Sequence, residues 1–228
     1  MDFAKFKEIL TKINQSKRNE KILIDLPENL DKFTLILLKF LINLKIKEKY
    51  LIEIDPKFIN SNFLITNIVN FNFDFDKFIE NYNFNSHTKN IIFFIVGELY
   101  DNIKEHSHSF DVYLYLEKNE KVYLGVFDNG ITFFNRYKEA GIEVKTHKEA
   151  IEKALEGISA KSIEERGFGL RTIKKITKDV NGKMCIFSGE GYAIIDDEER
   201  VDVLDFYFPG TGVILFFPLI FKNITEIL

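Results

Sequence analysis

The stretch from Ser86 to His106 reads SHTKNIIFFIVGELYDNIKEH, and its apolar residues recur at the spacing of one helix face. Ser86 is a candidate cap for this helix. Glu98 and Asn102 lie four residues apart within it, so their side chains point to the same side. The stretch therefore predicts a long amphipathic helix that presents a carboxylate and an amide to one cleft.

Two alternating apolar runs follow this helix, at residues 112–117 and 121–127, with a polar connection between them. This pattern is typical of a β-hairpin, whose second strand would end at Asp128, directly before Asn129 and Gly130. Apolar periodicity also predicts helices at about 148–156 and 170–180, and strands near 184–188, 192–196, 203–208 and 212–217. This part of the chain is therefore expected to form a sheet with helices packed on it.

The chain before Ser86 has a different organisation. Its pattern predicts a helix at 3–14, a strand at 21–26, a helix at 32–47 capped by Asp31, and a strand at 50–54. This order suggests a small α/β unit, and the Asn- and Phe-rich stretch from 60 to 85 is its ambiguous remainder. We place a boundary near residue 85, between a regulatory or interaction unit (1–85) and a second domain (86–228).

The Glu98 and Asn102 pair suits metal and water chemistry. Mg²⁺ prefers oxygen ligands and keeps several waters, so the Asn102 amide oxygen together with nucleotide phosphates is a plausible ligand set. Glu98 would then orient or deprotonate an attacking water. The alternative is that both residues belong to a solvated helix face, which is the commoner situation for such side chains.

Asp128 suits recognition of adenine. A carboxylate at the end of a strand accepts a hydrogen bond from the exocyclic amine, and Gly130 would let the backbone approach the ring. The alternative is an ordinary turn, because Asn-Gly is the commonest hairpin-turn dipeptide.

The segment Gly167-Phe168-Gly169-Leu170 opens a helix and suits phosphate binding. Glycines expose backbone amides, and the start of a helix offers free N–H groups and the positive end of its dipole. The preceding loop adds Lys161 and Arg166 as cations. The alternative is a Gly-rich loop before an amphipathic helix. Neither a P-loop motif nor a dinucleotide-binding fingerprint fits this segment. A further Gly210-Thr211 step leads into the last strand.

Composition narrows the functional classes. The 228 residues carry a net charge of −4, so no basic footprint for nucleic acid is evident. A single cysteine, Cys185, cannot form an intramolecular disulfide, which fits a reducing cytoplasm. The N-terminus lacks the apolar core of a signal peptide, and no apolar run is long enough to span a bilayer. We therefore expect a cytoplasmic protein without a membrane anchor.

In order and spacing, these motifs resemble the GHKL ATPase superfamily of DNA gyrase, the large heat-shock chaperones, sensor histidine kinases and the mismatch-repair protein MutL. The likeness covers about residues 86 to 220. It implies an α/β (α+β) two-layer sandwich of the Bergerat type, with a mixed sheet, helices on one face, ATP and Mg²⁺ between, and residues 131–168 as a mobile lid. It also implies that Asp128 and Thr211 bind adenine. Ribose and phosphates would be lined by Gly130, Gly167, Gly169 and Leu170.

Two departures from the superfamily's pattern matter for function. Thr132 stands where the first glycine box usually has a second glycine, and Glu105 stands where sensor kinases often have a phosphate-contacting lysine. Neutralisation of phosphate would then have to come from the lid, for which Lys161, Arg166 and Arg171 are candidates.

Two functions follow from the resemblance. One is an ATPase, or a kinase in intracellular signalling that acts on a separate protein, since residues 1–85 contain no histidine as phosphoacceptor. The retained Glu98 favours this reading, and the sequence around it also looks like stand-alone regulators such as anti-sigma-factor kinases. The other is a protein-interaction module that binds ATP with little turnover. The partner is unidentified in both, and a homodimer is compatible with either.

Overall fold

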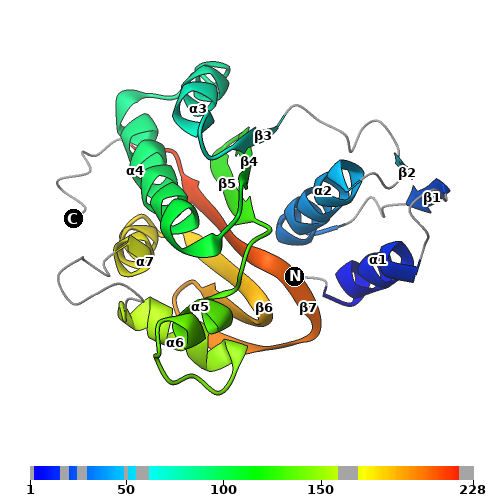
Figure 1. The fold of residues 1–228 in the computed structure, drawn as a ribbon. Coiled ribbons are helices and arrows are strands. Elements are labelled where there is room, and N and C mark those ends of the chain that lie inside the picture. The colour runs from blue at the N-terminus through cyan, green and yellow to red at the C-terminus, as the bar shows by residue number, and fades with distance from the viewer. Residues whose placement is uncertain are drawn as a thin grey trace. The chain divides into compact units, whose positions relative to one another are not determined.

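The computed structural model describes residues 3–15, 21–24, 30–48, 51–54, 62–158 and 169–220. In these residues the chain is of the α+β class, with seven α-helices and two sheets (Figure 1). It forms two compact units, Met1–Phe63 and Leu64–Leu228. The sequence pattern placed this division near residue 85, whereas the chain between 64 and 85 is part of the second unit.

The first unit has the order helix, strand, helix, strand, as predicted. Its elements are α1 (Phe3–Gln15), β1 (Lys21–Ile24), α2 (Lys32–Lys47) and β2 (Leu51–Ile54). β1 and β2 pair in parallel and are joined through α2, which is the crossover that a parallel pair requires. Asp31 caps α2 as predicted, because its Oδ1 accepts hydrogen bonds of 3.1 Å from the backbone N–H groups of Phe33 and Thr34.

The second unit contains a five-stranded sheet in the order β3-β4-β5-β7-β6. These strands are β3 (Phe63–Asn67), β4 (Asp111–Lys118), β5 (Lys121–Asp128), β6 (Lys183–Ile195) and β7 (Glu199–Pro218). The pairs β4–β5, β5–β7 and β6–β7 are all antiparallel, so the mixed pairing that we expected is not seen among these four strands. The reason is that β4 is joined to β5, and β6 to β7, by short hairpins rather than by crossover helices.

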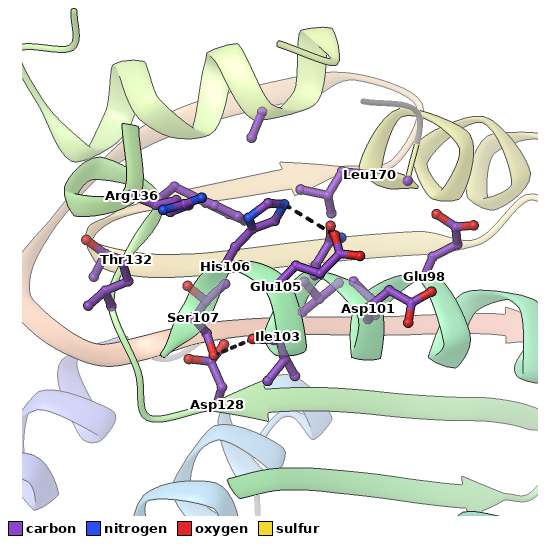
Figure 2. Close-up of a pocket in the computed structure, with 18 of the residues that line it drawn as sticks. Glu98, Asp101, Ile103, Glu105, His106, Ser107, Asp128, Thr132, Arg136 and Leu170 are labelled. Atoms are coloured by element: carbon purple, nitrogen blue, oxygen red, sulfur yellow. Dashed lines mark hydrogen bonds and ion pairs between the residues drawn. The ribbon is translucent and has the colours of Figure 1, made fainter. Parts of the chain in front are cut away.

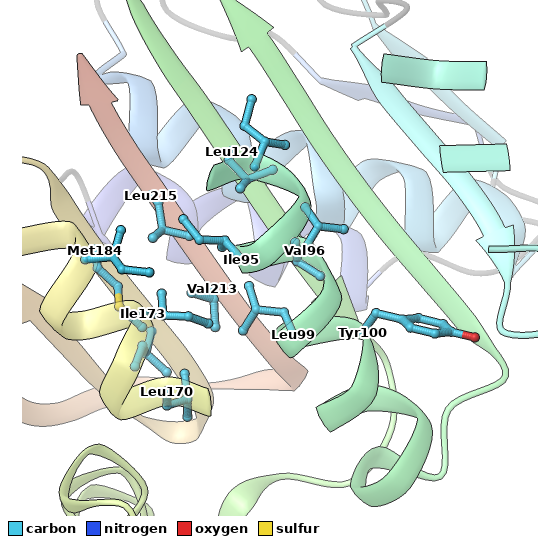
Figure 3. Close-up of a cluster of buried hydrophobic side chains, with 14 of the residues drawn as sticks. Ile95, Val96, Leu99, Tyr100, Leu124, Leu170, Ile173, Met184, Val213 and Leu215 are labelled. Carbon is cyan, nitrogen blue, oxygen red and sulfur yellow. The ribbon is translucent and has the colours of Figure 1, made fainter. Parts of the chain in front are cut away.

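Helices α4, α6 and α7 pack on one face of this sheet and enclose the core (Figure 3). The second unit's helices are α3 (Phe71–Glu80), α4 (Ser86–Asn102), α5 (Phe133–Glu139), α6 (His147–Glu156) and α7 (Gly169–Asp179). Leu99 of α4 and Ile173 of α7 meet Val213 of β7 within one buried cluster. Because alternate residues of a strand face the same side, this layer fixes which strand residues point toward the helices.

The predicted helix at 86–106 is present, but its two ends differ from expectation. Its cap is Asn85, whose Oδ1 accepts a 2.9 Å hydrogen bond from the N–H of Thr88, so Ser86 is the first helical residue. At the other end the last turn widens into a π-helix, Ile103–Ser107, which stops at the left-handed His108 (φ 56°). Wide turns of this kind are frequent at functional sites.

β6 and β7 are longer than the four short strands that the sequence predicted. Gly189 and Gly210 have positive φ angles of 63° and 83°, which glycine adopts easily. At Gly189 the register between the strands shifts, as in a β-bulge, and the pairing resumes beyond it. Both glycines, which lie between or beside the predicted short strands, are therefore inside continuous strands. Among the described residues, no helix is long and apolar enough to cross a membrane.

Candidate functional site

A cavity of about 280 Å³ lies in the second unit, near the lower end of the size range of ligand pockets (Figure 2). Its walls come from α4, the π-turn, β5, α5, α7 and β7, with one residue from α6. Six of the predicted site residues line it: Glu98, Asn102, Asp128, Gly169, Leu170 and Thr211. Segments that are far apart in the sequence therefore meet at one cavity.

Asp128 lies at the end of β5 and is only 2% exposed. Its Oδ1 accepts a 2.8 Å hydrogen bond from the backbone N–H of Gly130. Burial raises the pKa of the Asp128 carboxyl from 3.8 to about 7, while hydrogen bonds from the backbone of Gly130 and Thr211 act in the opposite direction. Such a buried acceptor at the wall of a cavity is suited to a polar ligand group.

Thr211 faces Asp128 across the paired strands β5 and β7. Its hydroxyl lies 3.0 Å from that of Ser188, and the Ser188 hydroxyl accepts a 3.0 Å hydrogen bond from the N–H of Phe133. Ser188 is buried, and the sequence pattern did not single it out. A hydroxyl in an otherwise apolar strand was the available signal, because buried polar groups need partners.

Glu98 and Asn102 lie next to the start of α7. A Cβ added at Gly169 would stand 2.8 Å from Oε2 of Glu98 and 3.4 Å from Nδ2 of Asn102. The carboxylate and the amide of α4 therefore lie over the first residue of α7, and a side chain at position 169 would displace the Glu98 carboxylate. Since the start of a helix favours anions, a phosphate at this end of the cavity would lie beside both groups.

Gly130 is close to Asp128 but is not among the lining residues. A Cβ added to it would stand 1.9 Å from the carbonyl oxygen of Ser107 and 2.9 Å from the N–H nitrogen of Ser109. The next residue, Ile131, donates a 2.6 Å hydrogen bond to the same carbonyl. The absence of a side chain thus allows the loop to pack on the π-turn, a different reason from the approach to a ring that we expected.

Thr132, which stands where the superfamily of the resemblance usually has a glycine, has a local structural role. It is fully buried and caps α5, with its hydroxyl accepting a 3.3 Å hydrogen bond from the N–H of Asn135. The sequence did not predict α5, and so missed three lining residues on it, Phe133, Arg136 and Tyr137. The Tyr137 hydroxyl donates a 2.5 Å hydrogen bond to the carbonyl of Ile158, and burial raises its pKa above the ordinary value of 10.

Acidic residues outnumber lysine and arginine in the described lining of the cavity. Carboxylates come from Glu98, Asp101, Glu105 and Asp128. Glu105 faces the cavity from the π-turn and lies 3.8 Å from Nε2 of His106, the ion pair drawn in Figure 2. Glu105, which the resemblance aligns with a lysine of sensor kinases, therefore lines the cavity.

Three predicted residues, Lys161, Arg166 and Gly167, lie outside the described residues. Arg171 is exposed on α7 and does not line the cavity. The expected lid runs from 131 to 168, and its described part, residues 131–158, contains α5 and α6. Among the residues that are described, no group of three or more His, Cys, Asp or Glu side chains could hold a metal ion.

The sequence matches no protein-family model, and no curated protein matches it at a significant level.

Proposed function

We propose that the second unit is a Mg-ATP-binding domain of the GHKL type, with the two-layer Bergerat arrangement. We further propose that it hydrolyses ATP or phosphorylates a separate protein in cytoplasmic signalling. One observation carries the proposal. Residues of four separate motifs, represented by Glu98, Asp128 and Gly169 together with Thr211, line one cavity although they come from different elements.

The Asp128 end of the cavity suits adenine. The carboxyl group is buried and anchored on one side by the backbone N–H of Gly130, so its remaining lone pairs suit an exocyclic amine. Apolar side chains line the cavity together with it, including Ile103 and Val213. A flat aromatic base needs such a combination of apolar walls and one well-placed polar group.

The opposite part of the cavity suits phosphates. α7 begins there with Gly169 and Leu170, and free N–H groups at a helix start attract anions. Mg²⁺, when bound, would supply charge neutralisation on the phosphates. Asn102 offers it one oxygen ligand, and most of the others would come from phosphate and water. Glu98 lies beside Asn102 and would hold the proton of an attacking water.

A second candidate function is a module that binds ATP and scarcely hydrolyses it. Glu105 supports it, because a carboxylate in the cavity replaces a cation that would assist phosphate transfer. The partner of such a module would respond to occupancy of the cavity.

Calorimetric titration with Mg-ATP tests the proposal, with turnover measured on the same proteins. Asp128→Asn should abolish binding. Asp179→Asn, the same chemical change at an exposed position of α7, should not alter it. Unchanged affinity of the Asp128 variant, or no binding by the wild type, would refute the adenine site.

Glu98→Ala separates the two functions. It should keep the affinity and lose hydrolysis if the protein is an ATPase, because an attacking water would lose its base. An undiminished rate would remove Glu98 as base. A wild type that binds Mg-ATP, shows no turnover and phosphorylates no protein would establish the module.

A further inference from the structure

Arg136 belongs to the cavity and to none of the predicted motifs. It lies one turn into α5, after the cap at Thr132, and its side chain is 26% exposed. Figure 2 shows it projecting from α5 into the cavity. Its Nη1 lies 3.4 Å from Oε2 of Glu139, an exposed carboxylate. Ion pairs with exposed partners are weak, so this pair holds the guanidinium group only weakly.

A second part of the Arg136 guanidinium group, the Nε–H, is a hydrogen-bond donor. Nε of Arg136 is buried and makes no hydrogen bond within the described structure. Buried N–H donors are nearly always paired, because leaving one unpaired costs free energy. A ligand oxygen that reached this donor would recover that cost, so the arrangement favours a bound acceptor beside α5.

Charge identifies the kind of acceptor. Among the described lining residues, four are carboxylates and Arg136 is the only lysine or arginine. Arginine stays charged at all relevant pH values, and its planar fork matches the oxygens of a phosphate group. A phosphate group bound near these carboxylates needs a cation within reach, whereas the neutral hydroxyl group of an unphosphorylated nucleoside does not.

We propose that Arg136 is a ligand-binding residue that contacts a phosphate of the bound nucleotide through Nε, so that the cavity distinguishes phosphorylated from unphosphorylated nucleosides. This inference rests on the proposed function for the identity of the nucleotide. It adds Arg136 of α5 to the cations that the sequence offered as candidates, Lys161, Arg166 and Arg171.

Calorimetry with adenosine, AMP, ATP and inorganic pyrophosphate tests the inference on the full chain. In Arg136→Gln the affinity for AMP and ATP should fall by about tenfold to a hundredfold, the range of a charge-assisted hydrogen bond, while the affinity for adenosine changes less than about twofold. Arg136→Lys keeps the charge but loses the Nε donor, so it should recover only part of the loss.

Lys138→Gln is the matched control. It removes the same charge two residues further along α5, at an exposed lysine whose ammonium group lies over the ring of Phe134, 4.2 Å from the ring centroid. It should leave all four affinities unchanged. Thermal melting of each variant checks that the fold is retained.

The outcomes separate the two proposals. Equal losses for adenosine and AMP, or no loss for either, would overturn the role of Arg136 and leave the nucleotide site intact. Binding of pyrophosphate that depends on Arg136, in a wild type that binds no nucleoside or nucleotide, would overturn the proposed function and retain the phosphate contact. A wild type that binds none of the four probes would overturn both.

Discussion

Replacing Asp128 by asparagine removes a titrating group from an almost fully buried position. Burial raises the pKa of this carboxyl to about 7, against 3.8 for an ordinary aspartate such as that of the unfolded chain. Between these two pH values the folded protein holds a proton that the unfolded chain has released. The free energy of unfolding therefore falls as the pH rises through this window, and levels off above about pH 7.

The size of the effect follows from the two pKa values. Each pH unit inside the window costs about 1.4 kcal/mol, so raising the pH from 5 to 8 should remove about 2–3 kcal/mol of wild-type stability through this group alone. Asparagine does not titrate, and its side-chain oxygen can still accept the hydrogen bond from Gly130. All other titrating groups are shared by the two proteins and largely cancel in the difference.

Urea unfolding of both proteins at pH 5, 6, 7 and 8 measures that difference directly. The variant should gain on the wild type by about 2–3 kcal/mol over this range, and the gain should level off near pH 8. A difference that stays constant from pH 5 to 8 would refute the reasoning, because Asp128 would then ionise equally in both states.

Three further changes test the packing around the cavity. Gly130→Ala forces a methyl group onto the backbone of the π-turn and should destabilise the protein by about 2–4 kcal/mol in urea unfolding; a loss below about 1 kcal/mol would contradict the close approach. Gly169→Ala meets only the movable end of the Glu98 side chain, so stability should change by less than about 1 kcal/mol while ATP turnover, if present, falls; equal turnover would argue against the alignment of these groups. Asn85→Ala should cost about 1 kcal/mol through loss of the cap, and Ser86→Ala should be nearly neutral; the reverse order would restore Ser86 as the cap.

Much of the fold could be predicted from local pattern. The predicted helices have 10 to 17 residues, which is long enough for the apolar spacing of a helix to be recognised: α1, α2, α4, α6 and α7. The β4–β5 hairpin, which ends at Asp128, likewise shows the alternation of a strand. α5 is not long enough, because its seven residues span barely two turns and show no clear period. Arg136 was missed for this reason rather than because of its chemistry.

Other features depend on contacts that a local pattern does not contain. Gly189 and Gly210 have the backbone of turns but lie within paired strands, since the pairing of β6 with β7 decides whether a glycine ends a strand or kinks it. β3 belongs to the second unit through its pairing with β4, far along the chain. The π-turn contains one apolar residue, Ile103, so its sequence has no apolar period from which the turn could be predicted.

The contact between Gly130 and the π-turn changes how the Asp-x-Gly signature should be interpreted in sequence searches. The glycine is required by the backbone of Ser107, whether or not a nucleotide is bound. Under the proposed function, a descendant of this protein that no longer bound a nucleotide would be free to replace Asp128 and would still have to retain Gly130. The aspartate is therefore the residue of the signature that would indicate a nucleotide site. The glycine indicates only that the π-turn after α4 and the loop after β5 pack together.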